Sequence, residues 1–281
     1  MDEKGLGKRL QMARQSAGLT QQQLCHQANL SFSTLTKIER GAIKAPSIFT
    51  IQSIASALHL SLDELVGSSA QAGRKLHKTK SGVSFVFFDV NGCLVHFFQQ
   101  AFVKVSADCG VPADVVESAF WHYNDDACRG VLSMADFNAK LAERIGVDKI
   151  SWQDYYLTTI EPIKPMQELI KWASEHYRVG LLTNIMPGLL QAMRRNGQVP
   201  DLAYDAVIDS SQVGMIKPEA EIYKIAMERA GVPPEEILLL DDSRANLMAA
   251  DKFDWRVMWF DSTHAEDMTE RVRQALEPAL N

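Results

Sequence analysis

The sequence predicts two domains: an all-α domain of five short helices, then an α/β domain built on a doubly wound parallel sheet with an inserted helical segment. Three observations support this prediction. A chain of 281 residues exceeds the usual size of one domain. Apolar residues recur at helical spacing from Leu6 to Val66. After Gly82, short apolar runs alternate with helical segments, which is typical of a parallel sheet with helices on both faces.

The composition indicates the class of protein and its compartment. Hydrophobic residues make up 46% and charged residues 23%, as in water-soluble globular proteins. No apolar run approaches the roughly 18 residues of a membrane span, and the first residues do not resemble a secretory signal. The cysteines lack metal-ligand spacing, which favours reduced thiols. We therefore expect a cytoplasmic protein without a membrane partner. The cysteines are Cys25, Cys93, Cys109 and Cys128.

The net charge of −6 is distributed unevenly along the chain. Residues 1–66 carry 7 basic and 5 acidic side chains, and residues 67–81 add 4 basic side chains and no acidic one. Residues 82–281 carry 18 basic and 30 acidic side chains. A basic N-terminal part on an acidic body indicates that only the N-terminal part binds a polyanion.

The five helices of the first domain are separated by recognisable caps and stops. Thr20, Ser31, Ser47 and Ser61 are residue types that cap helix N-termini, and Gly18 and Gly41 are suited to helix ends. The expected helices run from Leu6 to the stop at Gly18 and then over residues 21–28, 32–40, 47–58 and 61–66.

Two short helices joined by a turn of three or four residues fit a helix-turn-helix. Residues 6–66 resemble the phage repressor and Cro type (XRE-like) of DNA-binding domain. The resemblance implies a double-stranded DNA operator, a third helix in the major groove and a homodimer on two half-sites. It rests on Arg14-x-x-x-Gly18-Leu19-Thr20-Gln21-x-x-Leu24, then Ser31-x-x-x-Leu35-x-x-Ile38-Glu39-x-Gly41, Pro46 and Ala55-x-x-Leu58.

Carried over residue by residue, the resemblance assigns DNA contacts. Phe32, Ser33 and Lys37 become base readers, with a core position as the alternative for Phe32. The expected phosphate contacts are Gln21, Thr36 and Lys44. Arg14 and Glu39 match a pair that ties the first helix to the third in that family. The polar, basic residues 67–82 are expected to form a linker, either a solvated tether or a nonspecific hold on phosphate.

The second domain, residues 83–281, begins with a buried strand and continues with a helical stretch over 97–162, where helices are expected at 99–109, 112–125, 133–145 and 152–159. Strands and helices then alternate. Strands are expected at 83–88, 178–184, 204–210, 237–240 and 256–260, and further helices after Asn184 to Arg195, from Gly214 to Ala230 and over 244–251.

Polar residues follow three of these strands. Asp89 ends the first strand, Thr183 and Asn184 end the second, and Asp241 and Asp242 end a later one. Lys217 is expected at a helix start between them. The carboxyl ends of parallel strands share one edge, where ligands bind. A carboxylate nucleophile, a hydroxyl, a lysine and an acidic pair together predict a phosphate and Mg²⁺ site.

These motifs, in this order, resemble the haloacid dehalogenase-like (HAD-like) superfamily with its Rossmann-like core. The resemblance covers residues 82 to about 262 and makes 97–162 the inserted helical cap. It implies that Asp89 is the nucleophile, and that Thr183, Asn184 and Lys217 bind phosphate. Asp89, Asn91, Asp241 and Asp242 would hold Mg²⁺, and Asn246 would brace the last loop. The acidic pair favours the phosphatase branch, because the dehalogenase branch needs no metal.

One residue departs from that family's pattern. Phosphatases of this type have a second aspartate as general acid and base where this chain has Asn91. An amide cannot give and take back a proton, and such help contributes about 10²–10⁴-fold. Three hypotheses follow: a DNA-binding regulator that senses a phosphorylated metabolite with slow hydrolysis at most, an active phosphatase with the helix-turn-helix for autoregulation, or a dimerisation module with an inactive site.

Specificity is expected to come from the cap and from the loop after Asp89. His122 and Arg129 are the candidate substrate residues, in a region that also contains His96, Trp121, Asn124 and Asp125. For each of these, a surface or packing role is the alternative. Cys93 is either a small packed residue or a redox-sensitive thiol.

Overall fold

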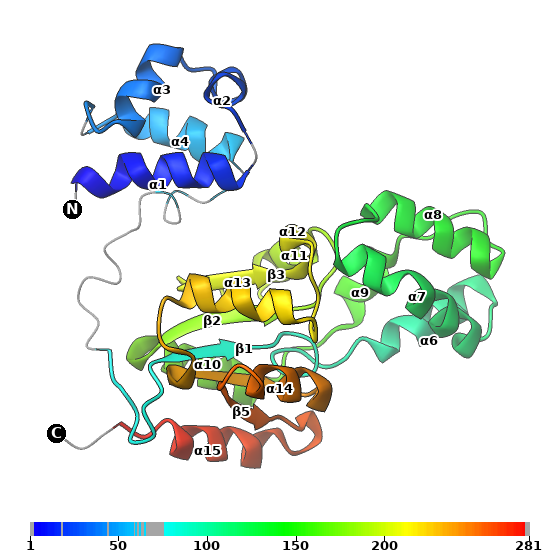
Figure 1. Cartoon of the computed structure of the whole chain (residues 1–281). Coiled ribbons are helices and arrows are strands. Elements are labelled where there is room, and N and C mark those ends of the chain that lie inside the picture. Colours follow the sequence, from blue (N-terminus) through cyan, green and yellow to red (C-terminus); the bar gives the residue numbers. More distant parts are fainter. Residues whose placement is uncertain are drawn as a thin grey trace. The chain divides into compact units, whose positions relative to one another are not determined.

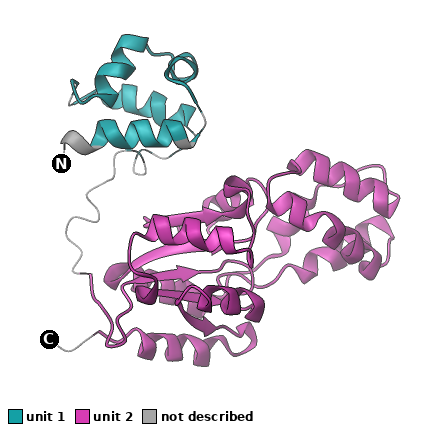
Figure 2. Cartoon of the chain, in the orientation of Figure 1, with its two compact units in different colours: residues 1–74 teal, residues 75–281 magenta. Residues whose placement is uncertain are grey.

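The computed structural model describes residues 3–17, 19–43, 45–58, 60, 62, 65 and 76–278. The chain divides into two compact units, residues 1–74 and 75–281 (Figures 1 and 2). Each unit is built around hydrophobic clusters of its own.

The first unit contains α1 (Glu3–Ser16), α2 (Gln21–Gln27), α3 (Phe32–Glu39) and α4 (Ile48–Ala57). The expected N-caps of the last three helices form, each through a side-chain oxygen that accepts a backbone N–H: Thr20 from Gln23, Ser31 from Thr34, and Ser47 from Thr50. The fifth expected helix, over residues 61–66, lies mostly outside the described residues, as do Gly18 and Lys44.

The core of this unit is a small cluster of aliphatic side chains in which Leu10, Leu24, Leu35 and Ile54 are fully buried. Beside it, Arg14 Nε donates to Glu39 Oε1 at 2.7 Å. Arg14 Nη2 donates to Glu39 Oε2 at 3.1 Å, so the pair is bidentate. The expected tie between α1 and α3 is therefore present.

The second unit is a five-stranded parallel sheet in the order β3-β2-β1-β4-β5. Its helices lie on both faces of the sheet (Figure 1). The chain leaves β1 at the centre, forms the two strands on one side, and then returns to form the other two. The strands are β1 (Phe85–Phe88), β2 (Arg178–Thr183), β3 (Ala206–Asp209), β4 (Ile237–Asp241) and β5 (Arg256–Trp259).

Alternation along β1 explains why both faces are covered. Phe85 and Phe87 belong to a cluster with Tyr223 of α13 (Ala220–Ala230), which also includes a residue of α14 (Arg244–Asp251). Val86 and Phe88 face the other cluster, which contains residues of α10 (Lys164–His176) and α15 (Ala265–Ala275). The remaining core helices are the short α11 (Leu189–Arg195) and α12 (Ser210–Val213).

The helical insertion is present as expected, with α6 (Gln99–Cys109), α7 (Ala113–Cys128), α8 (Met134–Ile145) and α9 (Trp152–Thr159). Its interior is aromatic: Phe98, Phe102, Phe120 and Trp152 have ring centroids 4.5 to 5.9 Å apart. In the described part of the chain, no helix has the length and apolar character needed to cross a bilayer.

Two local expectations need correction. Lys217 does not start a helix, because it lies in a turn and α13 begins only at Ala220. The strand expected at 204–210 is shorter, because Asp209 caps α12 through its side chain and turns the chain into that helix.

The linker expected at residues 67–82 also ends earlier, because residues 76–82 pack on the second unit. Lys78 Nζ lies 2.5 Å from Glu236 Oε1, and Lys80 Nζ lies 2.9 Å from Glu277 Oε2. Thr79 forms a β-bridge with Pro278. Two of the four basic side chains in this stretch therefore have acidic partners within the second unit.

Candidate functional site

Three neighbouring strands deliver the expected acidic and hydroxyl residues to one edge of the sheet. Asp89 directly follows β1, Thr183 ends β2 and Asp241 ends β4. Because β1 pairs with both β2 and β4, these strand ends are adjacent. The turn before α13 adds Lys217, so the structure brings together residues that lie up to 152 positions apart in the sequence.

Lys217 joins two of these strand ends. Its side chain is almost fully buried, and its Nζ lies 2.9 Å from Asp89 Oδ1 and 2.5 Å from Asp241 Oδ2. Burial lowers the pKa of Lys217, but the charges of Asp241 and Asp89 outweigh burial and hold that pKa above its ordinary value. The ammonium group therefore stays charged.

Asp241 organises the other groups around it. Its carboxylate accepts hydrogen bonds from Lys217 Nζ, from the backbone N–H of Ser243 at 2.8 Å and from Asn246 Nδ2 at 3.0 and 3.2 Å. The expected bracing role of Asn246 is thus visible in its contacts. Since these donors already occupy Asp241, its main effect is to position Lys217 rather than to offer free oxygens.

Asn184 has a different role from the one expected. Its Nδ2 donates to the backbone carbonyl of Lys217 at 2.8 Å, and its Oδ1 accepts from the Lys217 backbone N–H at 2.7 Å. The side chain therefore fixes the turn that carries Lys217, and its second amide N–H has no part in these two contacts.

Thr183 is fully buried, and its hydroxyl oxygen has no hydrogen-bond partner in the described part of the chain. A buried hydroxyl without a partner is unfavourable unless a ligand completes it. Its place at the end of β2 makes Thr183 a candidate contact for a phosphate oxygen.

The acidic side chains fit a hard cation. Carboxylate oxygens of Asp89, Asp241 and Asp242 lie within 4.8 Å of one another. Burial raises the pKa of Asp89 to about 7, against the opposing charge of Lys217 and with support from Asp241 and Asp242. Burial and the charge of Asp241 raise the pKa of Asp242 to about 6. Three acids sharing one lysine leave excess negative charge, which Mg²⁺ bound through oxygen would neutralise.

Gly92 allows the closest approach within this site. Its φ is +86°, and a Cβ built there would lie 2.1 Å from Asp242 Oδ2. Only glycine combines that backbone conformation with the space that the Asp242 carboxylate occupies.

The comparison of the chain with protein-family models settles its membership. The model described as haloacid dehalogenase-like hydrolase matches residues 83–254. The chain belongs to this family. A helix-turn-helix model matches residues 10–65, so an XRE-like helix-turn-helix domain precedes the HAD-like domain. Both parts of the expected fusion are confirmed.

Curated relatives match shorter stretches of this HAD-like protein. The chain is 28% identical over 134 residues to (S)-2-haloacid dehalogenase 4A of Burkholderia cepacia, which covers 48% of this chain and 55% of that protein. It is 47% identical over 47 residues to bifunctional epoxide hydrolase 2 of Rattus norvegicus, covering 17% of this chain and 8% of that protein. The chain thus spans about half or less of the length of these relatives.

Solved structures support the fold of the HAD-like domain. A magnesium complex of a HAD family enzyme from Bacteroides thetaiotaomicron has a TM-score of 0.58 at 20% identity and covers 68% of this chain and 98% of its own. A predicted HAD-like family hydrolase from Porphyromonas gingivalis has a TM-score of 0.57 at 22% identity, with coverage of 68% and 97%. At these identities the likeness shows the fold alone.

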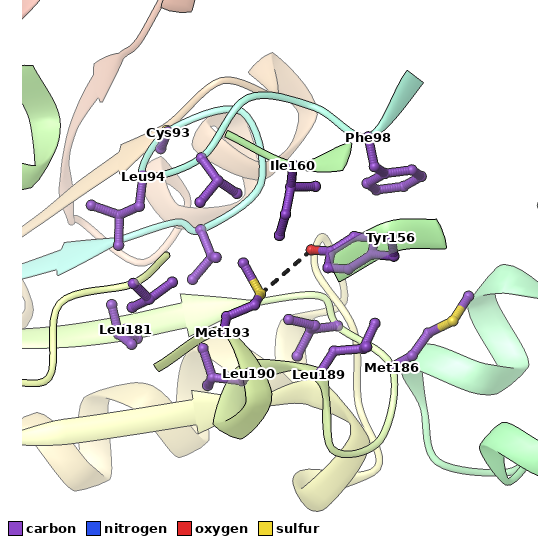
Figure 3. Close-up of a cluster of buried hydrophobic side chains, with 14 of the residues drawn as sticks. Cys93, Leu94, Phe98, Tyr156, Ile160, Leu181, Met186, Leu189, Leu190 and Met193 are labelled. Carbon is purple, nitrogen blue, oxygen red and sulfur yellow. Dashed lines mark hydrogen bonds between the residues drawn. The ribbon is translucent and has the colours of Figure 1, made fainter. Parts of the chain in front are cut away.

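In this HAD-like domain, Asn91 is held by the cap. Tyr156 of α9 donates its hydroxyl to Asn91 Oδ1 at 2.5 Å, and the same hydroxyl lies 3.6 Å from Met193 Sδ (Figure 3). Burial keeps the pKa of Tyr156 far above its ordinary value, so the phenol remains neutral and donates. Sequence reasoning missed Tyr156, because an aromatic residue on an amphipathic helix is indistinguishable from a packing residue.

The two cap residues proposed from the sequence do not line the pocket next to Asn91. His122 is exposed, with its ring against Tyr123. Arg129 pairs with Glu219 at 2.6 Å, which ties the end of α7 to the residue before α13. The pocket between cap and core is instead lined by Asn91, Phe98, Phe120, Asn124, Cys128, Trp152, Tyr156, Asn184, Ile185, Met186 and Leu189.

Cys93 is fully buried, with its Sγ 3.9 Å from the carbonyl oxygen of Leu240. Burial raises the pKa of its thiol well above the ordinary value. Reactive cysteines are accessible and have lowered pKa values, so the packed role fits this residue.

The first unit presents most of the expected DNA contacts on α3. Phe32 is 50% exposed, which excludes the core alternative, and Ser33 and Lys37 are also exposed. The Thr36 hydroxyl donates to the Phe32 carbonyl at 2.9 Å. Gln21 Nε2 donates to Glu39 Oε2 at 2.7 Å, so its amide nitrogen is engaged within the domain. The sixth expected contact, Lys44, lies outside the described residues.

Proposed function

We propose that this chain is a DNA-binding transcription regulator whose HAD-like domain binds a phosphorylated small molecule together with Mg²⁺ and hydrolyses it slowly. The observation that carries the proposal is the Asn91–Tyr156 contact. An amide, held by a buried neutral phenol, stands where acid–base chemistry requires a carboxyl group.

The binding half of the proposal rests on the strand-end cluster. Lys217 carries a buried positive charge, and Thr183 offers a hydroxyl without a partner in the described chain. Both groups suit a phosphoryl group bound next to Asp89. Asp89 and Asp242 are the residues that would hold Mg²⁺, with the backbone carbonyl of Asn91, and the cation would neutralise phosphoryl oxygens there.

The expected chemistry follows from the same residues. An Asp89 oxygen bonds to phosphorus while the ester oxygen leaves, which gives an aspartyl phosphate. The leaving oxygen needs a proton, and the water that later attacks phosphorus must lose one. Asn91 can do neither, so both steps should be slower by about 10²–10⁴-fold than with an aspartate there.

A haloacid substrate is disfavoured by the pocket, although two curated relatives are (S)-2-haloacid dehalogenases. A 2-haloacid carries a carboxylate that needs a cationic partner. Within the described residues no lysine or arginine lines the pocket. The pair Asp241 and Asp242 supports the Mg²⁺-dependent phosphatase branch instead.

The second candidate function is an active Mg²⁺-dependent phosphatase with the helix-turn-helix for autoregulation. The complete set of Asp89, Thr183, Lys217 and Asp242 favours it. A phosphatase assay with p-nitrophenyl phosphate and a panel of phosphate monoesters separates the two functions. We expect Asn91→Asp to raise turnover by about 10²–10⁴-fold and Asp89→Asn to remove it. Equal, rapid turnover by the unchanged chain and Asn91→Asp would favour the phosphatase.

The regulatory half of the proposal is tested on DNA. Operator affinity of the full chain, measured with and without saturating inorganic phosphate and Mg²⁺, should differ by about 5–150-fold, the usual range of coupling between sites. Sedimentation in both conditions tests the proposed homodimer. If ligand changes neither operator affinity nor the oligomeric state, the regulator proposal fails.

A further inference from the structure

The pocket between cap and core has an unusual lining for a protein that binds phosphorylated molecules. Seven of its eleven residues are apolar or aromatic, and four of them, Phe98, Tyr156, Met186 and Leu189, appear in Figure 3. The others are three amides and one thiol. Within the described residues, no charged side chain lines it.

This pocket belongs to the candidate site. Asn91 lies two residues after Asp89, and Asn184 directly follows Thr183, so two lining residues come from the loops that carry the phosphate-binding groups. The opposite wall comes from the cap, through Phe120 and Asn124 of α7 and Trp152 of α9. A group attached to a phosphate at Asp89 would extend between these walls.

The polar groups of the lining are partly used within the protein. Asn91 Oδ1 accepts from Tyr156, and Asn124 Nδ2 donates to Asp125 Oδ1 at 3.1 Å. Burial raises the pKa of Cys128 to about 12, so its thiol is neutral at ordinary pH. A second anionic group on the ligand would be buried here without a cation, and burial of an unpaired charge is strongly unfavourable.

The pocket is narrow in this structure. The empty space of about 220 Å³ between its walls includes the open mouth, so the enclosed part is much smaller. A ligand group therefore has to be small, and the cap has to move away from the core to admit it. A nucleoside or a sugar with several hydroxyl groups would also leave hydroxyls without partners against Phe98, Phe120 and Leu189.

We propose that the ligand is the phosphate monoester of a small, uncharged, apolar alcohol, with its aromatic or aliphatic group in this pocket. The inference rests on the proposed function, since it assumes a phosphoryl group at Asp89. It excludes bisphosphates, phosphorylated carboxylic acids and nucleotides as the preferred ligands.

Two non-hydrolysable probes of similar length test it on the full chain with Mg²⁺. Benzylphosphonate carries an apolar ring, and 3-phosphonopropionate carries a second anionic group. By calorimetry, benzylphosphonate should bind at least about tenfold tighter, because its ring is buried and no carboxylate is left unpaired. Equal or tighter binding of 3-phosphonopropionate would overturn the inference.

A matched pair of variants on α7 tests the location. Asn124→Phe fills the pocket wall, so the affinity for benzylphosphonate relative to inorganic phosphate should fall at least about fivefold. His122→Phe, on the same helix outside the pocket lining, should leave this ratio unchanged. The thermal unfolding curve of each variant verifies its fold. If His122→Phe lowered this affinity ratio more than Asn124→Phe, the apolar group of the ligand would not lie in this pocket.

Inorganic phosphate separates this inference from the proposed function. If phosphate binds with Mg²⁺ and benzylphosphonate binds no tighter than phosphate, only the apolar ligand class fails. If neither phosphate nor either phosphonate binds to the folded protein, the phosphate site itself fails, and this inference fails with it.

Discussion

At the scale of single residues, removing the buried hydroxyl of Thr183 should have opposite effects on the stability of the protein and on its phosphate affinity. We expect Thr183→Val, which keeps the shape and removes the oxygen, to raise the free energy of unfolding by about 1 kcal/mol, because the hydroxyl has no partner within the described chain. The same change should weaken Mg²⁺-dependent phosphate binding at least about tenfold. Urea unfolding and calorimetry on one preparation measure both, and Thr183→Ser should retain binding. Lower stability of Thr183→Val would show that the hydroxyl has a partner in the free protein.

Gly92 offers a second test at this scale, with Gly110 as its control. Both have positive φ, +86° and +70°, but a Cβ at Gly92 would overlap the Asp242 carboxylate, whereas a Cβ at Gly110 meets nothing within 4 Å. Gly110→Ala should cost about 1–2 kcal/mol of stability from backbone strain and leave Mg²⁺ affinity unchanged. Gly92→Ala should add a loss of Mg²⁺ affinity of about tenfold or more, since Asp242 must move. Mg²⁺ titration decides the matter, and equal affinity in the two variants would exclude Asp242 as a ligand.

At the scale of elements, the helix α3 carries expected base-contacting residues that are exposed in the structure. Lys37→Ala and Ser33→Ala should each weaken binding to the cognate operator by about 1–3 kcal/mol and affect random DNA much less, if both residues contact bases. Lys8→Ala, which removes an exposed lysine from α1, is the charge-matched control. Fluorescence anisotropy on both DNAs measures the difference. Equal losses on both DNAs would remove Lys37 and Ser33 from the reading surface.

Most elements could be predicted because their signals are local. The run before Asp89 is apolar and fully buried, and serine caps mark the starts of α3, α4 and α8. The helices missing from the prediction are α10, α12 and α15. The buried residues Met166, Leu169, Ile170 and Ala173 of α10 recur at helical spacing, so its signal was present in the sequence. In α15 a narrow stripe, Ala265, Met268 and Val272 with Leu276 just beyond, packs against the core. The helix α12 has 4 residues, too short for any periodicity to be visible.

The candidate site could be predicted only in part, for a physical reason. The end of a buried strand can be recognised in a sequence as an apolar run followed by a polar residue. This pattern identified Asp89, Thr183 and Asp241. The Tyr156–Asn91 contact joins residues 65 positions apart, and no pattern records which aromatic residue of the cap will reach that loop. The contacts of the Asn184 amide with the Lys217 backbone likewise join residues 33 positions apart and leave no pattern in the sequence.

At the scale of the whole molecule, the candidate site lies at the carboxyl end of β1. The segment that leads in from the linker, residues 76–82, precedes the other end of this strand. Residues 76–82 pack on the second unit before β1, and Asp89 directly follows that strand. A ligand effect on DNA binding must therefore be carried past the fully buried strand or through a dimer interface. Replacing Lys78 and Lys80 by glutamine should weaken this effect without changing phosphate affinity, because both lysines precede β1 and pair with Glu236 and Glu277, whereas Asp89 follows that strand. Operator titrations with and without phosphate measure it, and Lys104→Gln serves as the control.

The bridge between Thr79 and Pro278 also has a consequence for protein engineering. It places residues near the beginning and the end of the second unit side by side, as Figure 1 shows. Termini that lie together tolerate rearrangement of the chain order. A variant in which the second unit comes first and the helix-turn-helix domain is attached after residue 278 should therefore fold. Its phosphate affinity should equal that of the original chain. In a chain with the reverse domain order, the helix-turn-helix domain would join the second unit at the same place on its surface.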